Sequence, residues 1–451
     1  MKESLLRLWN ERKGPVLNMW NEKKVWIILV VVQVFANALI NALNRGGHVV
    51  AMATSGLLLM AIAVYATWYQ RKNLLSFMLN IVLLYFNYSL VAGVYWNTES
   101  MSGIFSSYSY AELLRGINVV LIFYVVYLCT LSGCEVREKR VFLEKSTPNW
   151  LITAGGAAYI ALAPFLFYHT ETFGVRGIAS AFYEYALIIL LVALAFSGRD
   201  WKALILLAIS SAWIVLHGLM HGERVLALQL MLVWGLYLLL HILSLKMIVP
   251  ACVVGIFVFT IFGVYRGISE LNGDVFSNIL HRLLDGGMAN DTSYAAFQTS
   301  LNVLRLAEQS TIWERLWLFL KYLAYIFAGS AVPDTNLALL AFEKIGWHGG
   351  GGWLPVYFDF WLGFPGVIAS GVLLGWLINK VSALNRKRDY LNYLALYVVA
   401  TSPRWYLYSP APLTRGLLMY TLAFVGATVV HRYGKTVLMW CVAKIKDWRK
   451  K

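Results

Sequence analysis

Long apolar runs alternate with short polar loops along most of the chain. A helix needs about 20 predominantly apolar residues to cross the hydrocarbon core of a bilayer. On that criterion the sequence predicts an all-α polytopic membrane protein with about twelve transmembrane helices. The predicted spans are 25–43, 49–69, 74–95, 117–133, 150–167, 181–197, 203–216, 225–243, 247–264, 356–379, 391–408 and 416–431.

Composition agrees with lipid as the solvent for most of the chain. Of its 451 residues, 59% are hydrophobic and 14% charged, whereas a soluble domain has about 25% charged residues. The net charge of +15 would suit a nucleic-acid partner, but the basic residues sit where loops meet spans and indicate topology instead, so no nucleic acid is expected. The four cysteines form no C-x-x-C pair, which predicts neither a disulfide framework nor a metal site.

Lysine positions predict which side each loop occupies. If the N-terminus is cytoplasmic, 16 of the 18 lysines fall in cytoplasmic segments, as the positive-inside rule requires. The apolar run from Val25 is too long for a cleavable signal peptide. The predicted organisation is a cytoplasmic amphipathic segment 1–24, helices one to nine over 25–264, a large external loop 265–355, helices ten to twelve over 356–431, and a basic cytoplasmic tail 432–451.

One stretch of the external loop, 312–328, is almost apolar enough to be a further span. Glu314, Arg315 and Lys321 interrupt it, and a thirteenth crossing would place the basic segment 380–390 on the wrong side. We therefore predict an amphipathic or re-entrant helix packed on the outer face of the membrane. Four aromatic side chains are expected at the headgroup level: Trp313, Trp317, Tyr322 and Tyr325.

The short outer regions contain arginine but no lysine. Arginine's planar fork matches phosphate and carboxylate oxygens in a way that lysine's ammonium does not. The set indicates either a cavity that binds anions or side chains that reach to lipid headgroups. It consists of Arg45, Arg115, Arg176, Arg224, Arg404 and Arg415.

Arg224 is the strongest of these candidates, because it ends the sequence HGLMHGER that starts at His217. His217 and His221 are four residues apart and share a face if the segment is helical. Three interpretations stay open: a metal site without an evident third ligand, a structural capping role, or an anion-binding corner in which His221 or Glu223 carries a proton.

The external loop supplies further candidates. Arg266 and the His281-Arg282 pair lie in its first third, and Asp334 either caps the short helix that follows or acts as a base. His348 adjoins four glycines, of which Gly350 and Gly351 would let backbone N–H groups approach a ligand closely. Two carboxylates near span ends, Glu184 and Asp359, are expected to pair with outward arginines.

The segment Gly349–Val367, GGGGWLPVYFDFWLGFPGV, resembles the glycine-rich segment before a late span in Wzy-type oligosaccharide repeat-unit polymerases. The twelve-span plan with one large late outer loop is also similar to theirs. A third likeness is the R-x10-G spacing, seen at Arg224 with Gly235 and at Arg415 with Gly426.

The resemblance implies a membrane glycosyltransferase class C-like fold in the bacterial inner membrane, with the site facing outward. It implies transfer of a growing glycan from undecaprenyl pyrophosphate to a new lipid-linked repeat unit, without a cofactor or metal. Membrane lipids, a chain-length regulator and a flippase would be partners. Pyrophosphate or glycan would bind at Arg224, Arg266, Arg282, Arg404, Arg415, Gly350 and Gly351, and the candidate bases are His281, His348, Asp334, His221 and Glu223.

Three alternatives remain at this point. A flippase or other transporter of lipid-linked oligosaccharides would also have about twelve spans, but transporters place charges near the midplane and contain discontinuous helices. An O-antigen ligase shares the layout and differs only in its acceptor. A non-catalytic membrane assembly protein would need none of the polar outer residues.

Overall fold

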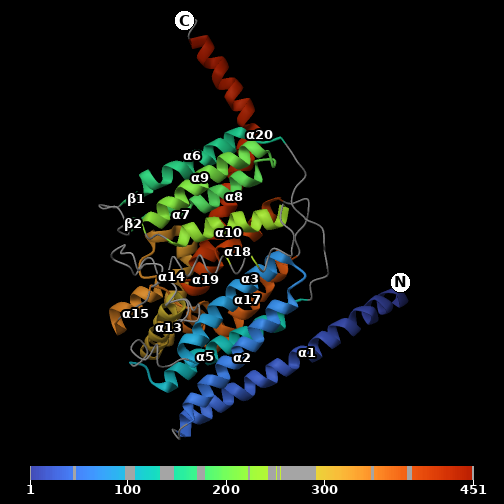
Figure 1. Ribbon diagram of the computed structural model, residues 1–451, viewed down its shortest axis with the longest axis vertical. Helices are drawn as coiled ribbons and strands as arrows, with labels where there is room; N and C mark the ends of the chain where they lie inside the picture. The colour runs from blue at the N-terminus through green and yellow to red at the C-terminus, as the bar shows by residue number, and fades with distance from the viewer. Residues whose placement is uncertain are drawn as a thin grey trace. The chain divides into compact units, whose positions relative to one another are not determined.

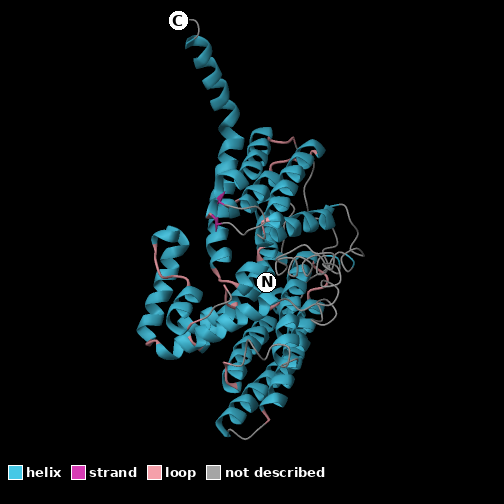
Figure 2. Cartoon of the chain, turned by 60° about the vertical axis from the view of Figure 1, so that its left-hand side comes forward, coloured by secondary structure: helices cyan, strands magenta, loops and turns pink. Residues whose placement is uncertain are grey.

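The computed structural model describes residues 2–43, 47–96, 107–132, 147–169, 178–221, 224–241, 250, 254, 291–346, 350–382 and 389–448. This part of the chain is helical apart from one pair of short antiparallel strands. The strands are β1 (Tyr168–His169) and β2 (Ile178–Ala179), drawn in magenta among the cyan helices of Figure 2. The fold is therefore all-α, as predicted.

The chain forms two compact units that interleave along the sequence. The first unit comprises Met1–Arg137, Phe276–Ala383 and Ser402–Pro410, and the second comprises Glu138–Val275, Leu384–Thr401 and Ala411–Lys451. Each unit thus draws helices from distant parts of the sequence.

The first unit is built around α5, which packs against α1, α2, α13, α16 and α17 (Figure 1). Its residues Leu114, Ile117 and Leu121 are fully buried, so apolar packing on several sides holds this helix. The elements of the unit are α1 (Lys2–Leu43), α2 (His48–Tyr69), α3 (Leu74–Leu90), a π-helix (Val91–Trp96), α5 (Tyr110–Thr130), α13 (Asp291–Gln309), α14 (Ile312–Ala328), a 3₁₀ turn (Gly329–Ala331), α15 (Leu337–Ile345), α16 (Leu354–Leu362), α17 (Phe364–Ser382) and α19 (Ser402–Leu407).

The second unit has α8 at its centre, in contact with α6, α9, α10, α18 and α20. Leu190, Leu191 and Leu194 of α8 are fully buried. The elements of this unit are α6 (Trp150–Phe167), β1, β2, α7 (Ala181–Glu184), α8 (Ala186–Ala195), α9 (Trp201–Met220), α10 (Arg224–His241), α18 (Asp389–Ala400) and α20 (Ala411–Trp448).

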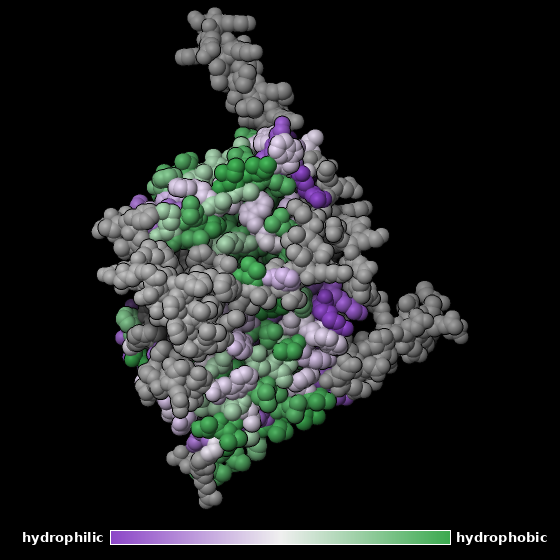
Figure 3. Space-filling view, in the orientation of Figure 1, coloured by the Kyte–Doolittle hydropathy of each residue, from purple (hydrophilic) through white to green (hydrophobic). Residues whose placement is uncertain are grey.

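Among the described residues, seven helices are long and apolar enough to cross a membrane, and four shorter helices are apolar. Eleven of the predicted spans overlap one of these helices, and the remaining span, 247–264, lies almost wholly outside the described residues. Large apolar side chains such as Val32 and Phe35 are exposed, and Figure 3 shows broad apolar areas in green. These findings agree with an all-α membrane protein; the number of crossings and the side of each loop stay predictions.

Among the described residues, four predicted spans depart from a continuous α-helix, one of them at Tyr185 between α7 and α8. The helix from Leu74 ends as the π-helix Val91–Trp96. The predicted span 356–379 is broken at Gly363, whose φ of 65° is left-handed, and Pro365 follows in the first turn of α17. The predicted span 391–408 is broken at Thr401, before the Ser-Pro that begins α19. A single glycine or proline can stop a helix while changing the average hydropathy of a long window only slightly.

Helix α5 starts seven residues earlier than the predicted span at 117. Ser109 is its N-cap and accepts from the backbone N–H of Glu112, whose carboxylate accepts from the Ser109 N–H in return. This capping box satisfies two N-terminal donors, so the helix begins at a polar signal rather than at the first apolar residue.

Helix α14 coincides with the stretch 312–328 that was predicted to be a non-spanning helix. Thr311 and Glu314 form a second capping box at its start. Trp313 and Trp317 are exposed, whereas Tyr322 is buried and stacks on Trp361 of α16 with ring centroids 4.5 Å apart. Tyr322 therefore faces α16, and its predicted depth at the headgroup level stays a prediction.

The C-terminal end of α5 is held by a buried lysine. Lys23 of α1 is 1% exposed, and its ammonium donates to the carbonyls of Cys129 (3.4 Å) and Leu131 and lies 5.0 Å from the Tyr69 ring. The last carbonyls of a helix have no partner within the helix. A cation at this position therefore satisfies them and also opposes the negative end of the helix dipole.

Replacing Lys23 with methionine is expected to lower the free energy of unfolding by about 1.5–3 kcal/mol, the usual value of a hydrogen bond to a charged group. The matched control is Lys24→Met, because Lys24 is the next residue and is exposed. Thermal unfolding of the detergent-purified protein, followed by fluorescence size exclusion, measures both variants. Equal melting temperatures for the two would show that Lys23 does not hold α5.

Candidate functional site

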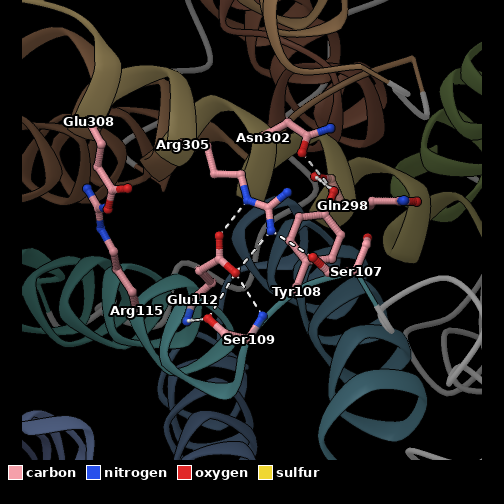
Figure 4. Close-up of polar contacts among 9 residues, drawn as sticks. All are labelled: Ser107, Tyr108, Ser109, Glu112, Arg115, Gln298, Asn302, Arg305 and Glu308. Atoms are coloured by element: carbon pink, nitrogen blue, oxygen red, sulfur yellow. Dashed lines mark hydrogen bonds and ion pairs between the residues drawn. The ribbon is translucent and has the colours of Figure 1, made fainter.

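Six charged side chains gather where α13 and α16 meet the N-terminal part of α5. We call them the arginine–carboxylate cluster. Its members are Glu112 and Arg115 of α5, Arg305 and Glu308 of α13, Arg315 of α14 and Asp359 of α16. All belong to the first unit, and Figure 4 shows the four that come from α5 and α13.

Arg305 and Glu112 form a clamp between α13 and α5. The Arg305 Nε lies 2.5 Å from Glu112 Oε1, and Nη2 lies 3.1 Å from Oε2 and 2.8 Å from the Ser107 carbonyl oxygen (Figure 4). Glu112 also accepts from Ser109 in the capping box. The carboxylate raises the pKa of the Arg305 guanidinium. Since these groups are already satisfied by one another, the pair fixes the two helices.

Tyr108 extends this clamp on the other side of Arg305. The guanidinium lies 4.4 Å from the Tyr108 ring centroid, in a cation–π contact. The Tyr108 hydroxyl donates to Asn302 Oδ1 (2.8 Å) and to the Gln298 carbonyl oxygen (3.3 Å), and burial raises the pKa of this phenol. Three turns of α13 are thereby tied to the residues just before α5.

Arg115 is held much less firmly. Its Nη1 pairs with Glu308, but the Arg115 side chain is 38% exposed and that of Glu308 is 60% exposed (Figure 4). Its Nη2 lies 4.0 Å from Oδ2 of Asp359, a side chain only 13% exposed. The pairing of Asp359 with an outward arginine was predicted. An exposed ion pair contributes about 0–1 kcal/mol to stability. An anion can therefore replace Glu308 as the partner of Arg115 with little loss of stability.

Arg315 of α14 holds the C-terminal end of α16. Its Nη2 donates to the Asp359 carbonyl oxygen at 2.6 Å and its Nε donates to the Phe360 carbonyl oxygen. These carbonyls are at the end of α16, where the Asp359 carbonyl also accepts from the Gly363 N–H at 2.8 Å, and a side-chain donor there satisfies the last turn of the helix. Of the three arginines in the cluster, Arg115 therefore has the guanidinium best placed to receive a ligand.

The glycines after His348 pack closely against the end of α19. A Cβ added to Gly351 would lie 2.6 Å from the Leu407 carbonyl oxygen, and the Gly352 N–H donates to the Tyr408 carbonyl oxygen at 3.1 Å. Gly350 has a φ of 90°. Close approach of two backbones explains why Gly351 has no side chain. The structure thus brings Gly351 and Gly352 beside the end of α19, the helix that carries Arg404, whereas an added Cβ at Gly350 would meet nothing within 4 Å.

The two histidines lie among aromatic rings in the second unit. The ring centroids of His217 and His221 are 4.6 Å apart, and Tyr168 lies 5.1 Å from the first and 5.8 Å from the second. His221 is buried as the C-cap of α9. In the described part of the chain no group of three His, Cys, Asp or Glu side chains is placed to hold a metal.

Asp334 does not cap a helix. Its φ of 59° is left-handed, and its carboxylate lies 3.3 Å from the Lys321 ammonium of α14, with side-chain exposures of 59% and 25%. Asn336 is the N-cap of α15, and its side chain accepts from the Ala338 N–H. The capping prediction is wrong because the helix starts two residues later than the sequence suggested.

The remaining predicted site residues fall in three groups. Arg404 lies on α19 in the first unit, and Arg415 lies on α20 in the second. Arg224 begins α10, and its side chain is outside the described part of the structure. The others lie outside the described residues: Arg266, His281, Arg282, His348 and Glu223.

Sequence reasoning missed Glu112, Arg305 and Glu308 as members of a site. One signal was present, since Ser109-x-x-Glu112 is a capping box that starts α5 early and places Arg115 on its second turn. Nothing in the sequence indicates that residues 291–309 pack back onto α5.

No family model, curated protein or solved structure matches the chain. The chemistry of the site therefore rests on its own groups, which can bind an anion at Arg115 and offer a carboxylate at Asp359.

Proposed function

We propose that this chain is a polymerase that joins lipid-linked oligosaccharide repeat units on the outer face of the bacterial inner membrane. The observation that carries the proposal is the half-exposed Arg115 guanidinium at one end of an apolar helix, beside the nearly buried carboxylate of Asp359. A pyrophosphate attached to a membrane lipid needs a cation near the end of such a helix. The sequence resemblance at Gly349–Val367, which includes Asp359, supports the same activity.

The reaction transfers a glycan between two lipid carriers. The acceptor hydroxyl oxygen forms a bond to the anomeric carbon of the growing glycan, while the bond from that carbon to the pyrophosphate oxygen breaks. Arg115 binds the pyrophosphate and stabilises the charge that develops on it, which is the role of preorganised donors in catalysis. The hydroxyl proton passes to a base. Undecaprenyl pyrophosphate leaves, and the new lipid carries the longer glycan.

Asp359 joins the candidates for the base. Its side chain is 13% exposed and lies within 4.0 Å of the arginine assigned to the pyrophosphate. Asp334, by contrast, is an exposed partner of Lys321, which disfavours it. An Asp359→Asn protein that still folds and binds lipid-linked substrate but forms no polymer would support the assignment of Asp359.

A gel ladder of surface polysaccharide from a strain lacking this gene tests the proposed function. The expected result is loss of the long ladder with single repeat units still attached to their acceptor. Polymer left on its lipid carrier would point to a ligase instead.

A transporter of lipid-linked oligosaccharides is the second candidate, and the interrupted helices favour it. Transporters commonly bind substrate at discontinuous helices, and breaks occur at Gly363 and Thr401. The same deletion strain separates the two functions. Loss of all surface repeats, with lipid-linked units accumulating inside the cell, would support transport.

Arg224→Ala is expected to abolish polymerisation while the protein stays in the membrane. Arg224→Lys should also be poor, because a point charge does not reproduce the two parallel hydrogen bonds of a guanidinium. Membrane levels of the variant, measured by immunoblot, provide the control. A wild-type ladder from the Arg224→Ala strain would show that polymerisation does not need Arg224.

A further inference from the structure

Helix α14 is apolar on two opposite faces, and the described part of the chain covers only one of them. The covered face lies on α16, where Phe319 and Tyr322 contact Trp361 with ring centroids 5.5 and 4.5 Å apart. Arg315 fixes the same face through the carbonyls at the end of α16. Contacts of this kind dock the helix firmly.

The opposite face carries large apolar side chains that are exposed. Trp313, Trp317 and Leu320 follow one another at intervals of four and three residues, the spacing of a single helix face. Their exposed fractions are 77%, 60% and 54%. A contiguous exposed apolar face marks a surface that contacts another protein or a membrane, and α14 is too short and too charged to count among the candidate spans.

The surroundings of this face identify lipid as its occupant. Arg315 reaches the break at Gly363, where its Nη2 would lie 3.8 Å from an added Cβ. The apolar helix α17 starts at the next residue, and its Phe364, Leu373 and Trp376 are 57%, 52% and 54% exposed. Helix α14 is therefore anchored at the start of an apolar helix, α17, that has an exposed apolar surface of its own.

The polar groups of α14 lie where headgroups would meet them. Glu314 is exposed in the first turn of α14. Lys321, in the middle of the helix, forms an ion pair with Asp334. Tryptophan prefers the boundary between acyl chains and headgroups. We propose that α14 is a non-spanning helix whose Trp313, Trp317 and Leu320 side chains insert into the bilayer among the lipid acyl chains. This proposal does not depend on the proposed polymerase activity.

The test uses full-length protein in which the four native cysteines are replaced by serine, reconstituted in phosphatidylethanolamine–phosphatidylglycerol vesicles. Single cysteines at Trp313→Cys, Trp317→Cys and Leu320→Cys carry a nitroxide spin label. Glu314→Cys is the control on the same helix that should face water, and Leu373→Cys on α17 is the control that should face lipid. Labelled proteins that elute as the parent does are measured by power saturation with oxygen and with a nickel chelate.

The expected result is a several-fold preference for oxygen over the nickel chelate at the three sites of α14 and at Leu373→Cys, and the reverse at Glu314→Cys. Access of the nickel chelate at the α14 sites would place this face in water and overturn the proposal. Poor access of both reagents would also overturn it, since the face would then be covered by protein, such as a second copy of the chain. If Trp313→Cys fails to fold, Leu323→Cys replaces it, because Leu323 is 39% exposed on the same helix.

Discussion

Polymer formation is expected to fall at least about 100-fold when Arg115 is replaced by alanine, the usual effect of removing one donor that stabilises developing charge. The protein itself should remain folded, because the Arg115–Glu308 pair is exposed and an exposed pair contributes about 0–1 kcal/mol. Arg115→Lys should recover a small part of the activity, since lysine keeps the charge but loses the planar fork. Chain-length distribution on a gel and the amount of membrane protein are the two measurements.

Two comparison variants separate a loss of activity at Arg115 from a loss of folded protein. Arg305→Ala breaks the clamp with Glu112 and should lower the amount of folded protein. The Glu112 carboxylate, which caps α5, then loses its cationic partner. Arg71→Ala removes an exposed arginine of the same unit whose guanidinium lies over Trp68, and it should change neither measurement. A full ladder from the Arg115→Ala strain would show that Arg115 does not bind the pyrophosphate.

Gly93→Ala is expected to lower the free energy of unfolding by about 1–3 kcal/mol, the range found for overpacked cores. Gly93 lies in the π-helix that follows α3. A Cβ added to Gly93 would be 2.0 Å from Cε1 of Tyr294 on α13. Tyr294 is 8% exposed, so its ring has little room to move. Because this contact docks α13, which carries Arg305 and Glu308, the variant should also lose polymerase activity.

A double-mutant cycle isolates that contact. Tyr294→Leu shortens the side chain that the new methyl group meets, so Gly93→Ala should be less harmful in that background than in the wild type. The matched control is Gly155→Ala in α6, where an added Cβ meets nothing within 4 Å. Melting temperatures from fluorescence size exclusion supply the comparison. If Gly93→Ala lowers the melting temperature equally in both backgrounds, Gly93 and Tyr294 do not pack as described.

The lengths of the apolar runs predicted most of the helices but not where they stop. The helix at 312–328 was placed correctly, and that it does not span the membrane stays a prediction that rests on the charges that interrupt it. The breaks at Gly363 and Thr401 were missed, since a hydropathy window averages over a glycine or a proline. An early start such as that of α5 depends on a single capping box that hydropathy does not register.

The candidate site was predicted only in part. Arginine was expected to bind anions because no lysine shares the outer regions, and Arg115 was in that set with Asp359 as an expected pairing partner. Which of the arginines are already occupied depends on tertiary contacts. Arg305 and Arg315 are bound to protein oxygens, and no local pattern in the sequence reveals that.

Reconstitution of the purified protein tests the central claim most directly. Vesicles containing the protein receive lipid-linked repeat units extracted from the deletion strain, and the products are separated by glycan length. A polymerase should produce lipid-linked glycans of two or more repeats, with one undecaprenyl pyrophosphate released for each bond formed. Repeat units that cross the bilayer at unchanged length, with no pyrophosphate carrier released, would contradict the account and identify a transporter.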